Sequence, residues 1–307
     1  MTASSATAPT VATAIAQATA QLEAAQVSFG HGTACAHDEA TWLVLWRLGL
    51  PLDDLDGVAD RALSGDEQAA IDTLVQQRIA TRKPAAYLTQ EAWLQGVPFY
   101  IDERSIVPRS FIAEVLALGT IDDMLSAQTR RVLDLCTGNG SLAVLAAMAY
   151  PDVSVDAADL SDDALAVARI NVDKHSLQDR IRVLHSDGLA SVDGPYDLIL
   201  CNPPYVNAQS MAALPAEYQA EPAMALGSGH DGMDFCRTLL QALRDDTARY
   251  LTPEGVVVLE IGNEQANFEA AFPDLPVFWL PTSSGDEQVL MVTAEMLSQS
   301  GFTIVTP

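Results

Sequence analysis

The chain has 307 residues, of which 49% are apolar, and its 16 basic and 41 acidic side chains give a net charge of −25. A chain of this length and apolar content can bury a sizeable core, and we expect two domains. Its acidity disfavours tight binding to nucleic acid, because an acidic surface repels phosphate, and would raise the association rate of a basic partner.

The cysteines and histidines give little support to a disulfide framework or a metal site. Four cysteines lie far apart without a C-x-x-C pair, which is typical of reduced thiols in a cytoplasmic protein. The five histidines lack the spacing of a metal site.

No apolar run reaches the ~18 residues of a membrane span. We interpret the first 20 residues, rich in Ala, Thr and Ser, as a frayed tail running into a helix.

Helical periodicity dominates from residue 11 to residue 82. A Gly-Leu-Pro break follows the apolar residues 42–48, and Ser64 and Asp66 are capping candidates for a helix that continues to residue 79. No cluster of titratable groups occurs in these segments. We therefore predict that residues 1–90 form a helical domain for substrate recognition, with scaffolding as the alternative.

Between residues 87 and 108 the pattern becomes extended, and Gly96 marks the turn of a predicted β-hairpin. Arg109 follows in a Pro-Arg-Ser triplet. It could hold a carboxylate of a ligand or of the protein, and an ordinary surface arginine is the competing interpretation. Residues 111–118 predict a short helix, so residues 91–127 are assigned to a hairpin and linker.

Strands and helices alternate from residue 131 onward. Helices are predicted at residues 141–150 and 162–174, and apolar runs predict strands at residues 132–136, 153–158, 181–185, 196–201, 255–261, 277–280 and 288–292. This alternation is typical of an α/β, doubly wound sheet. Residues 128–307 are therefore assigned to the catalytic domain.

A glycine turn and an acidic residue indicate an adenosine-containing cofactor. The turn Cys136-Thr137-Gly138-Asn139-Gly140 would bring backbone N–H groups close to a ligand at a helix start. Asp159 lies 19 residues beyond Gly140 at the end of the next strand, where a carboxylate can hold both ribose hydroxyls. Ala143 replaces the third glycine of a dinucleotide fingerprint, which favours S-adenosylmethionine over NAD. Asp187 would meet the adenine amino group or lie in a solvated loop.

The segment Asn202-Pro203-Pro204-Tyr205 directly follows the apolar residues 196–201. Prolines lack an N–H donor and end the strand, so this segment lies at the carboxyl edge of the sheet, where ligands bind. The Asn202 oxygen and the proline carbonyls present acceptors only, which suits a planar –NH2 group, and Tyr205 adds a flat face. A proline-rich turn that merely ends a strand is the alternative.

These motifs resemble those of the class I methyltransferases of the HemK/PrmB group, which methylate protein glutamines. Within that group, the Pro-Arg-Ser triplet and the loop at residues 211–224 are most similar to enzymes acting on a large-subunit ribosomal protein. The resemblance spans about residues 93–294, with a weaker match in the helical front. It rests on residues 134–140, Asp159, residues 197–205, Glu221-Pro222 and residues 231–234.

The resemblance implies a Rossmann-like fold with an antiparallel last strand and S-adenosylmethionine as cofactor. Residues 136–140 would line its methionine part, Asp159 its ribose, and Asp187 and Gly188 its adenine side, although relatives carry a bulky residue where this chain has Gly188. Asn202 would contact both cofactor and substrate, and Pro203, Pro204 and Tyr205 would complete the glutamine site. The implied partner is a basic ribosomal protein.

Three alternatives stay open. A release-factor glutamine is the nearest, since related enzymes of the same group act on it. The Asn-Pro-Pro-Tyr motif also occurs in enzymes that methylate exocyclic amino groups of bases, which the acidic charge disfavours. The third alternative is a non-catalytic cofactor-binding protein whose helical half is a docking module.

Overall fold

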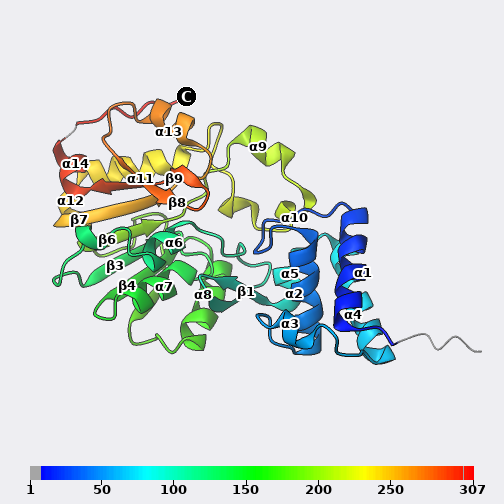
Figure 1. Cartoon of the computed structure of the whole chain (residues 1–307). Coiled ribbons are helices and arrows are strands. Elements are labelled where there is room, and N and C mark those ends of the chain that lie inside the picture. The colour runs from blue at the N-terminus through cyan, green and yellow to red at the C-terminus, as the bar shows by residue number, and fades with distance from the viewer. Residues whose placement is uncertain (1–7, 300) are drawn as a thin grey trace, which may run out of the picture. The chain divides into compact units, whose positions relative to one another are not determined.

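The computed structural model describes residues 8–299 and 301–307 (Figure 1). The chain divides into two compact units. One holds the described residues up to Glu91 together with Pro215–Ala220, and the other holds Ala92–Leu214 and Glu221–Pro307. Seven residues of the predicted N-terminal tail lie outside the described residues, and the first helix begins at Val11. The division at residues 90 and 127 stays a prediction.

The first unit is helical, as the periodicity predicts. Ser64 caps α4 by accepting from the backbone N–H of Glu67, whose side chain accepts in turn from the backbone of Ser64. Its apolar core is formed by α1, α2 and α4. The helices are α1 (Val11–Ala24), α2 (Ala36–Leu48), α3 (Leu55–Val58), α4 (Gly65–Thr81), α5 (Ala85–Thr89) and α10 (Ala216–Gln219).

A buried arginine joins the late segment Pro215–Ala220 to the N-terminal helices within this unit. The guanidinium of Arg78 donates from Nε to Glu39 at 2.8 Å and from Nη1 to Glu217 at 3.1 Å, and its Nη2 donates to the carbonyl of Ser28 at 2.9 Å. The side chains of Arg78, Glu39 and Glu217 are at most 2% exposed. Arg82, whose Nε lies 2.8 Å from Glu217, supplies the second positive charge, so the two carboxylates are compensated inside the helical unit.

The second unit is built on a seven-stranded sheet of order β5-β4-β3-β6-β7-β9-β8. Only β9 runs antiparallel to its neighbours, and it is the last strand of the chain, as expected. The strands are β3 (Arg131–Leu135), β4 (Ser154–Asp159), β5 (Ile181–His185), β6 (Tyr196–Cys201), β7 (Leu251–Glu260), β8 (Phe278–Thr282) and β9 (Gly285–Thr293). The β-hairpin β1 (Glu91–Leu94) and β2 (Val97–Tyr100) has its turn at Gly96.

Both faces of the sheet are covered by helices, because each strand alternates apolar side chains between two cores. Leu198 and Leu200 of β6 face the core shared with α6 and α7, whereas Ile199 and Cys201 face the core shared with α11, α13 and α14. These helices are α6 (Ile112–Ala117), α7 (Ser141–Ala149), α11 (Asp234–Asp245), α13 (Gln265–Ala271) and α14 (Ala294–Gln299). Asn202, the first residue after β6, therefore lies at the carboxyl edge of the sheet.

The remaining elements are short, apart from α8 (Asp162–Lys174), which coincides with its predicted range. No helix among the described residues is long and apolar enough to cross a membrane. The short helices are α9 (Ala208–Ala213), α12 (Thr247–Tyr250), η1 (Asp122–Met124) and η2 (Ala223–Ala225).

Candidate functional site

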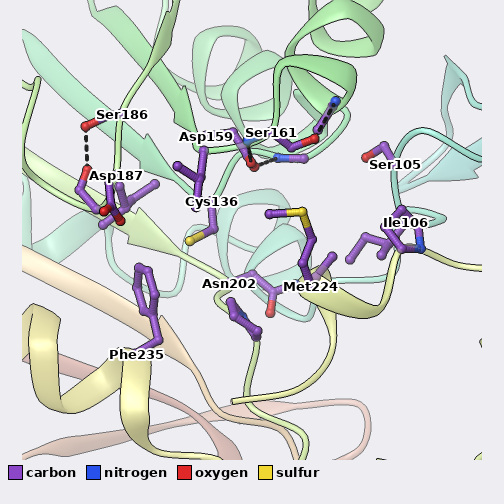
Figure 2. A pocket seen from close by; sticks show the side chains of 18 of the residues that line it. Ser105, Ile106, Cys136, Asp159, Ser161, Ser186, Asp187, Asn202, Met224 and Phe235 are labelled. Atoms are coloured by element: carbon purple, nitrogen blue, oxygen red, sulfur yellow. Dashed lines mark hydrogen bonds between the residues drawn. The ribbon is translucent and has the colours of Figure 1, made fainter. Parts of the chain in front are cut away.

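A cavity opens at the carboxyl ends of β3, β4, β5 and β6, within the second unit. The space between its walls, counted out to the open mouth, is about 780 Å³. Figure 2 shows Cys136, Asn202, Met224 and Phe235 around this hollow. Of the predicted site residues, the cavity wall contains Cys136, Gly138, Asp159, Asp187, Gly188, Asn202 and Pro204.

The glycine turn after β3 has the tight backbone that its sequence predicts. Cys136, Gly138 and Gly140 all have positive φ, at 59°, 55° and 80°. A Cβ added at Gly140 would lie 3.1 Å from the Cβ of Ala168 in α8, so glycine lets the turn pack against that helix. Thr137, Asn139 and Gly140 shape the turn but are not among the cavity-lining residues.

Asp134 holds the turn from inside the sheet. Its Oδ2 accepts from the hydroxyl of Thr137 and, at 2.9 Å, from the backbone N–H of Ala143, whereas Oδ1 has no hydrogen-bond partner among the described residues. Burial raises the pKa of this carboxyl to about 7, and the hydrogen bonds act in the opposite direction. The turn therefore closes on an acid that exchanges a proton near neutral pH.

The free energy of unfolding of the wild type, measured relative to that of an Asp134→Asn variant, should consequently fall as pH rises. In the unfolded chain the pKa of an aspartate is ~3.9, so between that value and about 7 the folded protein keeps a proton that the unfolded chain releases. This raised pKa stabilises at low pH, and the benefit is lost as pH rises through about 7. Urea unfolding at pH 5 and pH 8 should show a decline on the order of 3 kcal/mol against the variant. A stability difference between the wild type and Asp134→Asn that is the same at pH 5 and pH 8 contradicts this expectation.

Asp159 lies at the end of β4 and faces the cavity. Its two oxygens accept from the backbone N–H groups of Gly138 and Ser161, each at 2.9 Å, and burial raises the pKa of the carboxyl. Asp187 and Gly188 follow β5 in the same wall, and Gly188 has a φ of 51°. A residue other than glycine would be strained there, which explains why this chain lacks a bulky side chain after Asp187.

The segment after β6 is divided between two surroundings. Asn202 and Pro204 line the cavity, and the buried Oδ1 of Asn202 has no hydrogen-bond partner among the described residues. Pro203 is buried, and Tyr205 lies outside the cavity wall with its hydroxyl 3.3 Å from Glu260. The structure thus brings Asn202 to the same cavity as the glycine turn and places Tyr205 against the end of β7.

Several cavity residues carry no signal in the sequence. They come from the loop after the hairpin, from the two positions after β4, and from the segment that follows the Asn-Pro-Pro-Tyr motif. These residues are Arg104, Ser105, Ile106, Leu160, Ser161, Met224, Ala225 and Phe235. Arg109 connects the loop after the hairpin to the segment that follows the Asn-Pro-Pro-Tyr motif, because it donates to both oxygens of Glu221 at 2.7 Å. Arg109 therefore holds a carboxylate of the protein, one of the interpretations open from sequence.

Metal-ligating side chains do not gather in the described part of the chain. Within residues 8–299 and 301–307, no group of three or more His, Cys, Asp or Glu side chains is placed to hold an ion. The polar side chains of the cavity wall are the carboxylates of Asp159 and Asp187, the amide of Asn202, three serine hydroxyls and the Arg104 guanidinium. Such a set binds an organic ligand with hydroxyl and amino groups.

The sheet order, its single antiparallel strand β9, and a cavity lined by a glycine turn and by the carboxylate at the end of β4 are those of a class I methyltransferase fold. A family model described as "Methyltransferase small domain" matches residues 115–223. Among solved structures, the hMettl16 catalytic domain in complex with a 3′UTR hairpin superposes with a TM-score of 0.51 at 15% identity, covering 83% of this chain and 88% of that chain. This likeness supports the fold alone.

Curated relatives are far more similar in sequence. Ribosomal protein uL3 glutamine methyltransferases of Burkholderia pseudomallei and Bordetella pertussis are each 49% identical, covering 94% and 92% of this chain and 95% and 94% of their own lengths. That of Neisseria meningitidis serogroup A is 46% identical over 91% of each chain. The chain belongs to this family of protein-glutamine methyltransferases, as the sequence motifs indicate.

Proposed function

We propose that the protein transfers a methyl group from S-adenosylmethionine to the side-chain amide nitrogen of a glutamine in ribosomal protein uL3. The observation that carries this proposal is the buried Asn202 oxygen, which lacks a partner among the described residues and lines the cavity beside the glycine turn. An amide –NH2 group is the donor that such an oxygen accepts. The printed names of the relatives supply the protein that bears the glutamine.

The cavity wall fits S-adenosylmethionine. The turn at Cys136 and Gly138 would face the methionine part, Asp159 the ribose hydroxyls, and Asp187 and Gly188 the adenine side. The bound cofactor would supply an electrophilic methyl group on a sulfonium. The relatively apolar wall, which includes Met224 and Phe235, would exclude water from that methyl group.

Replacing Asp159 with asparagine should weaken cofactor binding by ~10- to 100-fold, because hydrogen bonds to a charged acceptor contribute ~1.5–3 kcal/mol. The amide would keep the shape but lose the charge and one acceptor. Isothermal titration with S-adenosylmethionine measures the change. Asp152→Asn, at an exposed position outside the cavity, is the matched control and should bind as the wild type does. Equal affinity in Asp159→Asn and the control would contradict the ribose role.

The protein's part in the chemistry is orientation. An amide nitrogen is a poor nucleophile because its lone pair is shared with the carbonyl, as the ~18–20 kcal/mol peptide rotation barrier shows. The Asn202 side-chain oxygen and a proline backbone carbonyl would accept the two N–H bonds and aim the nitrogen at the methyl group. Positioning of this kind can contribute about 7–11 kcal/mol, and no dedicated general base is invoked. As it takes the methyl group, the nitrogen would leave the sulfonium as a neutral thioether, and one N–H proton of the amide would pass to solvent.

The same acceptors select amides over acids. A glutamate carboxylate has no N–H to donate and would face the Asn202 oxygen. A basic substrate protein suits a chain of net charge −25. A reaction on a ribosomal protein also agrees with the cytoplasmic location expected from the free thiols.

The test is to incubate the purified protein with labelled S-adenosylmethionine and, separately, with unmethylated uL3 and a release factor. Peptide mass spectrometry then locates the label. Label on a glutamine of uL3 is the expected result. Label on the release factor alone would keep the reaction and reassign the substrate, and the absence of label on both would overturn the proposal.

A further inference from the structure

The end of β7 contacts Tyr205, which is not among the cavity-lining residues. The Tyr205 hydroxyl donates to Oε1 of Glu260 at an O···O distance of 3.3 Å. The ring lies against Gly262, whose φ is 54°, and a Cβ added there would be 2.5 Å from Cε2 of the ring. Since a larger residue cannot stand at that position without moving the ring, the turn after β7 fixes the plane of Tyr205.

Glu260 has no direct access to a ligand in the cavity. The residue is 2% exposed and is not among the cavity-lining residues of the described chain. Its Oε2 accepts from the hydroxyl of Ser110 at 2.6 Å and from the backbone N–H groups of Phe111 and Ile112 at 2.9 and 3.4 Å. Any effect of this carboxylate on the reaction must therefore pass through a neighbouring residue. Tyr205 is the neighbour that belongs to Asn202-Pro203-Pro204-Tyr205, which we call the acceptor segment.

The backbone on the far side of Tyr205 is anchored independently. The side-chain amide of Asn207 donates to Oε1 of Glu264 at 2.6 Å. A Cβ added at Gly232 would be 2.1 Å from the carbonyl oxygen of Tyr205, so that loop also lies directly on the segment. These contacts restrain the chain, whereas the hydroxyl bond to Glu260 and the contact with Gly262 act on the Tyr205 ring itself.

We propose that Glu260 is a positioning residue for glutamine methylation. Glu260 accepts a hydrogen bond from the Tyr205 hydroxyl and so fixes the orientation of the ring. The fixed ring in turn holds the turn in which Asn202 presents its oxygen to the substrate amide. This inference rests on the proposed function. The 3.3 Å separation is long for an O–H···O bond, and catalytic hydrogen bonds commonly tighten once the substrate is bound. The effect therefore falls on kcat rather than on cofactor affinity.

A double-mutant cycle on Tyr205→Phe and Glu260→Gln tests the inference. Tyr205→Phe removes only the hydroxyl, and Glu260→Gln keeps the side-chain volume but can accept on one atom only. Each single change is expected to lower kcat about tenfold on uL3, with the KM for S-adenosylmethionine within about twofold of the wild type. The double variant is expected to match the slower single variant, because both changes break the same contact. A multiplicative loss of about 100-fold would overturn the inference.

Ser110→Ala separates positioning from the anchoring of α6. It removes a donor to the other oxygen of Glu260, so it should lower the urea midpoint while keeping kcat within about twofold of the wild type. A loss of kcat in Ser110→Ala equal to that in Glu260→Gln would show that Glu260 acts only through α6, and would overturn the inference. Methylglutamine is measured in the wild-type reaction in parallel. Its absence there overturns the proposed function, whereas its presence together with a multiplicative cycle overturns only the role of Glu260.

Discussion

Asn202→Ala is expected to lower kcat by ~100- to 1000-fold while S-adenosylmethionine binding stays within a few-fold of the wild type. The alanine removes the buried oxygen that would accept the substrate N–H, and this oxygen has no other hydrogen bond to lose among the described residues. The fold should therefore tolerate the change. Steady-state methylation of uL3 with mass-spectrometric quantification of methylglutamine measures kcat, and titration calorimetry measures cofactor affinity.

The control is Asn263→Ala. Asn263 is exposed, lies outside the cavity, and accepts a hydrogen bond from Gln288, so its loss should leave kcat unchanged. Asn202→Asp is a sharper comparison, because it keeps an acceptor of nearly the same shape and adds a charge beside the cofactor. If Asn202→Ala binds the cofactor and turns over at the wild-type rate, Asn202 is not the acceptor, and the assignment of the acceptor segment is wrong.

The centre of the sheet could be predicted because strands such as β3 and β6 are buried on both faces, whereas the edge strands β5 and β8 are partly exposed. Continuous apolar runs such as Tyr196–Cys201 are the signal of that environment, and β5, β6 and α8 coincide with their predicted ranges. The helix α11 was not predicted, although Leu239, Leu240 and Leu243 repeat with helical spacing. Local pattern therefore carried the strands and the helices α6, α7 and α8 of the second unit, whereas α11, α13 and α14 on the other face of the sheet were not predicted.

The cavity divides into a part that local motifs predict and a part that they cannot. Asp159 and Asn202 follow strands directly, and parallel strands bring such positions to one edge. Met224 lines the same cavity because Arg109 pairs with Glu221, 112 residues further along the chain. No periodicity records a contact over that separation. The same applies to Pro215–Ala220, which joins the helical unit through Arg78 across 139 positions.

Arg78→Ala is expected to destabilise the helical unit by about 3–5 kcal/mol, the usual cost of breaking a buried ion pair from one side. The arginine is fully buried between Glu39 and Glu217, and its removal would leave both buried carboxylates without this partner. Burial already raises the pKa of Glu39, although Arg78 acts in the opposite direction. Because Trp42 and Trp46 lie in the helical unit, their fluorescence reports on that unit when Trp93 and Trp279 are replaced by phenylalanine, and a urea titration of this chain measures the loss.

The pH dependence of this loss identifies its cause. Without Arg78, the buried carboxylates should have raised pKa values in the folded protein, so the variant gains stability at low pH and loses it as pH rises through those values. The gap to the wild type should therefore narrow from pH 7 to pH 5. Arg47→Ala, an exposed arginine of α2, is the control and should leave the urea midpoint nearly unchanged. A gap of the same size at both pH values would assign the loss to packing.

Increased hydrogen exchange at residues 215–220 in Arg78→Ala would show that Glu217 anchors this segment, which lies in the sequence between the acceptor segment and the cavity wall at Met224.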